Sequence, residues 1–325
     1  MKPASGTALG SAVAVAVAVA ALAASAPAGV ERAHGKAAQA SGLRIVSTIG
    51  LDSAPTDLIA ASGSLWASLG REEIVRIDPE TNRIVARIQP GGVGLAAGFG
   101  AVWAFDILAG EVLRIDPGTN RVTRRIQVGG LPTGIAVGHG SLWVANQLDS
   151  TVSRISPETG RTVAWIQLER GGIWPGAILA TSDAVWAVAG NGNVVNRIRP
   201  ETSTVDLRIP IRGARAITVA RGSVWVGVAD SASLVRIANG KAIRVAVPGR
   251  RANAYGPQLA GGTALWLAVP GSVARVGSLG GREPSIRLRA HHYLSAIAVA
   301  GDVWVADQTA ERVLRLAEID VIEHP

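Results

Sequence analysis

The sequence predicts an all-β fold, a seven-bladed β-propeller of four-stranded antiparallel blades, and three observations support this prediction. Seven tryptophans recur at spacings of 37, 40, 43, 39, 41 and 38 residues, at Trp66, Trp103, Trp143, Trp186, Trp225, Trp266 and Trp304. An arginine follows each of them after nine to eleven residues, at Arg76, Arg114, Arg154, Arg197, Arg236, Arg275 and Arg315. Short apolar runs separated by glycine or proline turns fill each unit, without the 3.6-residue apolar period that helical repeats require.

Each unit contains the signals of four strands. A short apolar run such as residues 134–137 leads through a tight glycine turn into the tryptophan run, which gives the first two strands. The arginine run is the third strand. In the first four units a proline turn follows, as in residues 78–82, and then a fourth strand such as 84–88 or 122–126. The fifth unit has the two-residue turn Asn239-Gly240 instead.

The two ends of the repeat region complement each other. No clear fourth strand follows Leu316 in the last unit, whereas residues 43–50 look like a fourth strand without its unit. We therefore expect the N-terminal strand to complete the last blade and close the ring, which would remove an exposed sheet edge. The predicted division is a signal peptide at 1–28, a linker at 29–42 and the propeller at 43–325.

The N-terminal segment has the three parts of a Sec-type secretory signal. Lys2 precedes the apolar run 12–24, and the small residues 26–28 follow it. The run is shorter than a bilayer span, so we expect cleavage and a secreted or extracytoplasmic protein without a membrane span. An uncleaved anchor is the alternative. The chain has no cysteine, which excludes disulfides, iron–sulfur clusters and thiol nucleophiles.

The charge balance is basic, with 32 lysine and arginine residues against 24 acidic ones. Only Lys2, Lys36 and Lys241 are lysines, and such an arginine-rich, lysine-poor chain is typical of a GC-rich genome. The functional alternative is attraction to anionic cell-wall polymers or nucleic acid. No basic run with interleaved aromatic residues supports nucleic acid as a partner. We expect a monomer.

Candidate site residues are those that depart from the repeat. The tryptophans and arginines recur in every unit, so we interpret them as scaffold. Three loops before inner strands carry aromatic residues, at 171–175, 250–257 and 289–293. Together with polar residues at strand ends, of which Asp57 is one, they predict a site at the channel mouth for a planar or sugar-like ligand. The predicted ligand-binding residues are Trp174, Arg215, Tyr255, Gln258, His291, His292, Tyr293 and Asn146. Packing of the loops on the ring is the alternative explanation.

Residues 140–146 and 152–160 resemble YVTN-type propeller repeats, and also the streptogramin (virginiamycin B) lyase family, over residues 43–316. The lyase resemblance implies a histidine and an acidic residue near a divalent metal in the central channel. His292 would be the general base, with Asp106 or Asp307 near Mg²⁺ or Ca²⁺. Asp106, Asn146 and Asp307 are equally typical of turn caps, and no clustered ligand motif is present.

The sequence therefore favours a secreted, non-catalytic propeller that binds a small molecule, a glycan or a protein through its loop face, without a cofactor. The alternative is a metal-dependent carbon–oxygen lyase, or a related hydrolase, with its site in the central channel. DNA binding, which the YVTN resemblance allows, is the third hypothesis.

Overall fold

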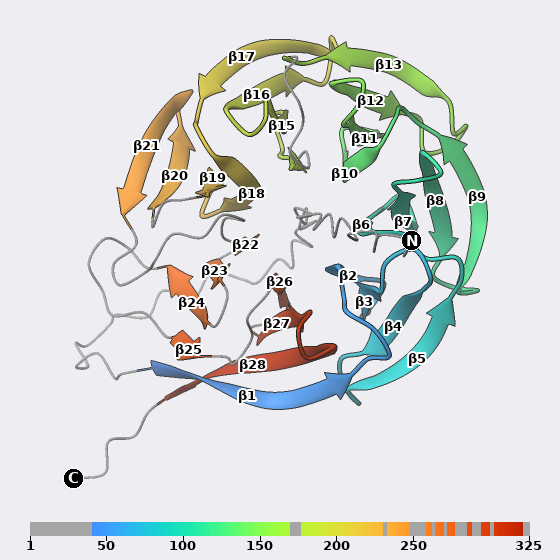
Figure 1. The fold of residues 1–325 in the computed structure, drawn as a ribbon, viewed down its shortest axis with the longest axis vertical. Helices are drawn as coiled ribbons and strands as arrows, with labels where there is room; N and C mark the ends of the chain where they lie inside the picture. The colour runs from blue at the N-terminus through green and yellow to red at the C-terminus, as the bar shows by residue number, and fades with distance from the viewer. Residues whose placement is uncertain are drawn as a thin grey trace, which may run out of the picture.

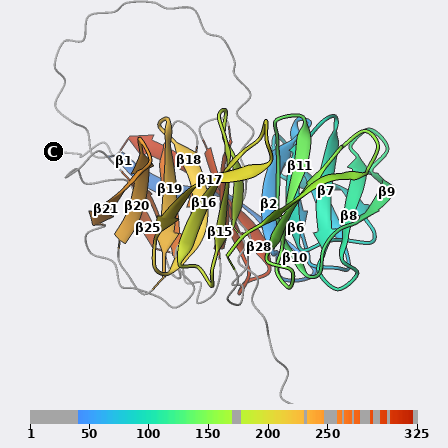
Figure 2. The same ribbon diagram turned by 90° about the horizontal axis from the view of Figure 1, so that it is seen from above.

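The computed structural model describes residues 41–169, 177–229, 233–246, 258–261, 264–269, 272–276, 285–287, 294–299 and 302–320. In this part of the chain the strands form seven four-stranded antiparallel sheets arranged around a ring, which confirms the predicted β-propeller of four-stranded blades (Figure 1). Figure 2 shows the ring from its rim, with the strands running across its thickness. The described residues contain no helix long and apolar enough to span a membrane.

We number the sheets 1 to 7 along the chain. Sheet 1 consists of β2 (Asp57–Ala61), β3 (Ser64–Ser68), β4 (Ile74–Asp78) and β5 (Arg83–Ile88). Sheet 2 consists of β6 (Gly94–Gly98), β7 (Ala101–Asp106), β8 (Glu111–Asp116) and β9 (Arg121–Gln127). Sheet 3 consists of β10 (Pro132–Gly138), β11 (Ser141–Asn146), β12 (Thr151–Ile155) and β13 (Thr162–Gln167). Sheet 4 consists of β14 (Ile178–Ala180), β15 (Val185–Ala189), β16 (Val194–Arg199) and β17 (Thr204–Pro210).

The remaining sheets follow the same order. Sheet 5 consists of β18 (Ala214–Ala220), β19 (Ser223–Val228), β20 (Ser233–Ala238) and β21 (Lys241–Ala246). Sheet 6 consists of β22 (Gln258–Ala260), β23 (Leu265–Val269), β24 (Ser272–Val276) and β25 (Ser285–Arg287). Sheet 7 consists of β26 (Leu294–Val299), β27 (Asp302–Asp307), β28 (Arg312–Asp320) and β1 (Ser41–Gly50). In each sheet the first of these strands lies nearest the middle of the ring (Figure 1).

The N-terminal strand is the outer strand of sheet 7. β1 pairs antiparallel with β28, from Ser41 opposite Asp320 to Gly50 opposite Arg312. The chain then passes directly into sheet 1, and Leu51 donates its backbone N–H to the Glu311 carbonyl at 2.8 Å. One buried cluster joins Ile49, Leu51 and Trp304 to residues of sheet 1 such as Leu58 and Leu65. The first and last sheets of the chain therefore share a core.

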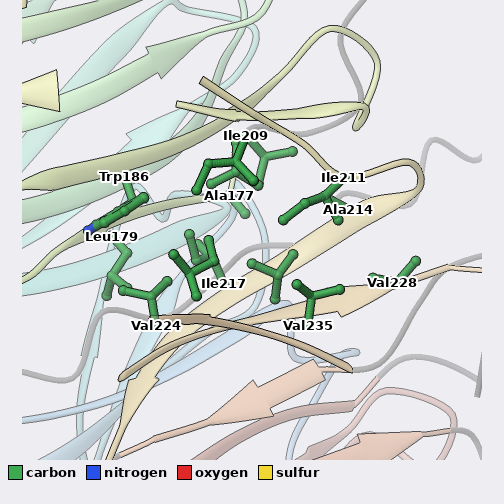
Figure 3. Close-up of a cluster of buried hydrophobic side chains, with 14 of the residues drawn as sticks. Ala177, Leu179, Trp186, Ile209, Ile211, Ala214, Ile217, Val224, Val228 and Val235 are labelled. Carbon is green, nitrogen blue, oxygen red and sulfur yellow. The ribbon is translucent and has the colours of Figure 1, made fainter. Parts of the chain in front are cut away.

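Apolar side chains from facing sheets form the core, because alternate residues of each strand point to opposite neighbours. Between sheets 4 and 5, Leu179 and Trp186 pack with Ile217, Val224 and Val235 (Figure 3). Each sheet holds one of the seven repeated tryptophans in its second strand, and six of them are buried. Trp66 is completely buried and donates its indole N–H to the Ala61 carbonyl at 3.0 Å. The interpretation of these tryptophans as scaffold is confirmed.

Candidate functional site

The candidate site residues that the structure describes lie at one end of the ring. The loops between second and third strands share this end with the connections from one sheet to the next, since both follow strands that run in the same direction. Asp106, Asn146 and Asp307 end β7, β11 and β27, each three residues after its tryptophan. All three side chains are buried.

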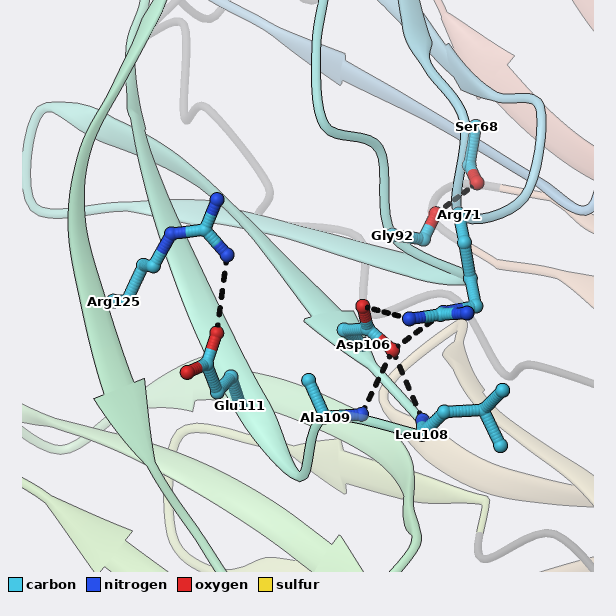
Figure 4. Close-up of polar contacts among 8 residues, drawn as sticks. All are labelled: Ser68, Arg71, Gly92, Asp106, Leu108, Ala109, Glu111 and Arg125. Carbon is cyan, nitrogen blue, oxygen red and sulfur yellow. Dashed lines mark hydrogen bonds and ion pairs between the residues drawn. The ribbon is translucent and has the colours of Figure 1, made fainter.

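Asp106 joins sheet 2 to sheet 1. Arg71, in the β3–β4 loop, donates from Nε to Asp106 Oδ1 at 2.7 Å and from Nη2 to Oδ2 at 3.0 Å. Oδ1 also accepts the backbone N–H groups of Leu108 and Ala109, so the carboxylate caps its own turn (Figure 4). Burial acts to raise the pKa of Asp106, but the hydrogen bonds from Arg71 and the two backbone N–H groups outweigh it. The pKa therefore lies below its usual value, and both oxygens are engaged.

Asp307 and Asn146, in contrast, form their hydrogen bonds within their own sheets. Arg312 donates from Nε to Asp307 Oδ2 at 3.0 Å, and the Ala310 N–H donates to Oδ1 at 3.2 Å. Asn146 donates from Nδ2 to the hydroxyls of Thr151 and Ser153, whereas its buried Oδ1 has no hydrogen-bond partner. Sheet 1 lies between the sheets of Asp106 and Asp307, and no described group of three or more histidine, aspartate or glutamate residues could hold a metal ion.

Arg215 packs against the neighbouring sheet. It is the second residue of β18. Its Nη1 donates to the Ala214 carbonyl at 2.9 Å and to the Asn191 carbonyl at 3.5 Å. A Cβ on Gly192 would lie 2.5 Å from the backbone carbonyl oxygen of Ala214, and Gly192 has a φ of 78°, so this position beside the guanidinium requires glycine. Arg215 therefore lies at the predicted end of the ring, over the β15–β16 loop of sheet 4.

The inner strands reveal an asymmetry at one level of the ring. In each sheet the repeated tryptophan of the second strand lies opposite one residue of the first strand. We compare the residue two positions before that one in the sequence. In sheets 2 to 5 this residue is small and apolar: Gly94, Gly134, Ala177 and Ala216. In sheets 6, 7 and 1, which follow one another around the ring, it is polar: Gln258, Ser295 and Asp57. We call these three positions the polar arc.

Asp57 is the one ionisable residue of this level, and it is completely buried. Its Oδ1 accepts the backbone N–H of Leu58 at 2.8 Å, and its Oδ2 accepts that of Leu95 in the next sheet at 2.7 Å. The carboxylate therefore bridges the inner strands β2 and β6. Among the predicted ligand-binding residues, Gln258 begins β22 within the polar arc. Trp174, Tyr255, His291, His292 and Tyr293 lie outside the described residues.

A chain of polar side chains, which runs from the buried Asn196 to the exposed Arg208 and which sequence reasoning missed, precedes the segment that contains Trp174. Asn196 in β16 donates from Nδ2 to Glu169 Oε2 at 2.7 Å, and Arg208 donates from Nε to Oε1 at 2.5 Å. Burial acts to raise the pKa of Glu169, but the hydrogen bonds from Asn196 and Arg208 outweigh it and lower the pKa. The signal was available, because Asn196 stands at a third-strand position that is apolar in every other sheet except sheet 3, which has Ser153. This chain anchors Glu169 at the start of the loop.

Comparisons with known proteins identify the fold. No protein-family model and no curated protein sequence matches this chain. Among solved structures, a chain of the hydrazine synthase of Kuenenia stuttgartiensis is similar, with a TM-score of 0.66 and 14% sequence identity. The similarity covers 85% of this chain and 98% of that one. At this identity it supports the β-propeller fold and carries no information about activity.

Proposed function

We propose that this protein is a β-propeller binding module that holds a glycan or another polyhydroxylated small molecule at the inner ring. The polar arc carries the proposal. Four sheets of the same fold place glycine or alanine at this level, so Asp57, Gln258 and Ser295 depart from the repeat. Burial of the Asp57 carboxylate costs free energy, which its hydrogen bonds from two backbone N–H groups offset. Three polar residues at one inner level of consecutive sheets are a reason to expect a polar ligand there.

The chemistry of the arc fits a sugar. Amide and hydroxyl groups are hydrogen-bonding partners for sugar hydroxyls, and the completely buried Asp57 fixes the backbone of β2 and β6 at this level through two backbone N–H groups. In the sequence, Tyr255 and Tyr293 precede the two inner strands that carry Gln258 and Ser295. Such tyrosines would supply flat faces for stacking on a sugar ring. Segment 1–28, acting as a cleaved secretory signal, would deliver the module outside the cytoplasm.

The experiment is a thermal-shift screen of the full chain with neutral chito-oligosaccharides, glucosamine and other sugars, repeated on two variants. Asp57→Ala introduces a residue type that Ala177 and Ala216 already place at this level. It also removes the acceptor of two backbone N–H groups, so the effect of sugar is measured against the variant's own ligand-free melting temperature. Asp116→Ala removes an equal charge at the opposite end of the ring. We expect at least one sugar to raise the melting temperature of the wild type and of Asp116→Ala but not of Asp57→Ala. No stabilisation by any sugar, or equal stabilisation of Asp57→Ala, would refute the proposal.

A lyase related to the streptogramin lyases is the second candidate. The observation in its favour is that His291 and His292 immediately precede β26, whose sheet also carries the buried Asp307. Against it, the oxygens of Asp106 and Asp307 already accept hydrogen bonds from arginine and backbone groups. Mass spectrometry of a streptogramin B depsipeptide incubated with the full chain and Mg²⁺ tests it directly. A linearised product that His292→Ala abolishes would establish this activity.

A further inference from the structure

Three of the repeated arginines bridge neighbouring sheets at the end of the ring opposite the polar arc. In sheets 1, 3 and 7 the arginine donates from Nε to the residue that begins the second strand, which is Ser64, Ser141 or Asp302. Its Nη1 then reaches the proline carbonyl in the turn of the next sheet, at 2.6 Å to Pro117, 2.6 Å to Pro200 and 2.9 Å to Pro79. The guanidinium carbon lies 5.1 to 5.2 Å from the tryptophan ring centroid. We call this arrangement the arginine bridge.

Sheets 2 and 4 lack the arginine bridge because they have alanine at the start of the second strand. Their second strands are preceded or begun by alanine, Ala101 and Ala184, which cannot accept a hydrogen bond from Nε. Arg114 instead donates to Thr123 at 2.9 Å, and Arg197 pairs with Asp206 at 3.0 Å, both within their own sheets. Their distances to the ring centroids lengthen to 5.9 and 6.0 Å.

A pocket of about 510 Å³ lies where the bridge is missing between sheets 2 and 3. Its lining residues are Phe99, Arg114, Thr123, Arg124, Pro157 and Glu158. Pro157 is the proline whose carbonyl the bridge would reach if Arg114 followed the pattern of Arg76. The size is within the range of small-molecule sites.

The pocket contains two guanidinium groups that form no ion pair in the described chain, although the side chain of Glu158 also lines it. Arg124 lies directly opposite Arg114 in the β8–β9 pairing. Sheets 1, 3 and 4, which have the same proline turn between the third and fourth strands, have alanine or leucine at this position. Like charges in directly opposed positions are destabilising. In the described chain neither arginine has an ion-pair partner, whereas Arg197 has Asp206. Arg124 donates only from Nη1, to the Glu158 carbonyl at 2.6 Å, which leaves its Nε and Nη2 for a ligand.

Phe99 is the third departure at this pocket. It occupies the first position of the β6–β7 turn with a φ of 54° and is 45% exposed. Sheets 1 and 3 place Ser62 and His139 at the same turn position, and a bulky residue in this left-handed conformation is strained. The left-handed conformation is shared with sheets 1, 3 and 5, but an exposed aromatic side chain at this position is found in sheet 2 alone among these four sheets.

We propose that this pocket binds a small aromatic carboxylate, at a second site independent of the proposed glycan site. The ligand carboxylate would accept paired hydrogen bonds from Arg114 and Arg124, and its ring would lie against Phe99 and Pro157. The exposed carboxylate of Glu158 stands at the rim and repels ligands with more than one negative charge. A monoanion with one aromatic ring therefore fits the pocket better than phosphate.

The test is titration of the full chain with benzoate, followed by calorimetry and by ligand-detected NMR, with benzyl alcohol, cyclohexanecarboxylate and inorganic phosphate as comparison probes. Arg124→Ala introduces the residue that Ala86 and Ala164 provide at this position in sheets 1 and 3. Its matched control is Arg125→Ala, which removes the same charge one residue away, where Arg125 pairs with Glu111 instead (Figure 4). We expect saturable benzoate binding that Arg124→Ala weakens about tenfold or more and Arg125→Ala leaves nearly unchanged.

A third variant changes no lining residue. Ala101→Ser supplies the hydroxyl that Ser64 and Ser141 offer in their sheets, and it should draw Arg114 into the arginine bridge with Pro157 and close the pocket. Benzoate affinity should then fall while the melting temperature rises. The proposal is wrong if benzoate does not saturate the wild type at millimolar concentration, or if phosphate binds more tightly. It is equally wrong if Arg124→Ala and Arg125→Ala weaken binding to the same extent.

Discussion

Arg76→Ala should destabilise the ring far more than Arg114→Ala, although both remove a repeated arginine that stacks on a tryptophan. Arg76 donates to Ser64 at 2.8 Å, to Pro117 at 2.6 Å and to Asn120 at 3.0 Å, and so ties sheet 1 to sheet 2. Arg114 donates to Thr123 alone, within its own sheet.

The magnitudes follow from these contacts. For Arg76, two short bonds from a charged donor at about 1.5 kcal/mol each and a cation–π contact of about 0.5 kcal/mol give about 3.5 kcal/mol. For Arg114, one bond of about 1 kcal/mol and a cation–π contact of about 0.5 kcal/mol are partly offset by about 0.5 kcal/mol from relief of the repulsion with Arg124, which leaves about 1 kcal/mol. At about 2 °C per kcal/mol, the melting temperature should fall by about 7 °C for Arg76→Ala and by about 2 °C for Arg114→Ala.

Differential scanning calorimetry of the two variants at one pH and ionic strength measures this contrast. Arg76→Lys is the control, because lysine keeps the charge but its compact ammonium lacks the planar guanidinium fork that spans Ser64 and Pro117. It should lose most of the stability that Arg76→Ala loses. Equal shifts for Arg76→Ala and Arg114→Ala would refute the reasoning that the contacts between sheets, rather than stacking on tryptophan, carry the stabilisation.

Three further predictions concern other parts of the ring. A chain that begins at Ser53 lacks β1 and should melt at a sharply lower temperature, because β28 loses its partner; an unchanged transition would contradict this. Asp106→Asn should lower the free energy of unfolding at pH 7 and lower it less at pH 3. The pKa of Asp106 is lowered in the folded protein, so its carboxylate stabilises the fold at a pH above the pKa of about 4 in the unfolded chain, and this contribution is lost as the pH falls through the folded-state pKa. Denaturant unfolding at the two pH values measures it, and an equal loss at both would exclude the ion pair with Arg71 as the cause. Ser64→Ala should convert Arg76 to the arrangement of Arg114, which a crystal structure of the variant would show.

Much of the fold was predictable because the same local sequence pattern recurs seven times along the chain. Glycine turns, tryptophan runs and proline turns are local signals, and β5 and β9 fall within a residue of their predicted bounds. The candidate site was less predictable. Asp106 and Asp307 fit the sequence pattern of metal ligands as well as that of turn caps, and only their contacts with Arg71 and Arg312 distinguish the two.

The sequence by itself determined the strand order, the tryptophan core and the positions at which the repeat is broken, since each depends on residue type and spacing along the chain. It could not determine which broken positions meet in space. The polar arc joins residues from three sheets, and the pocket between sheets 2 and 3 joins Phe99 and Arg124 to Pro157. Only the tertiary structure decided these, because the packing of one sheet on the next sets which turn an arginine can reach.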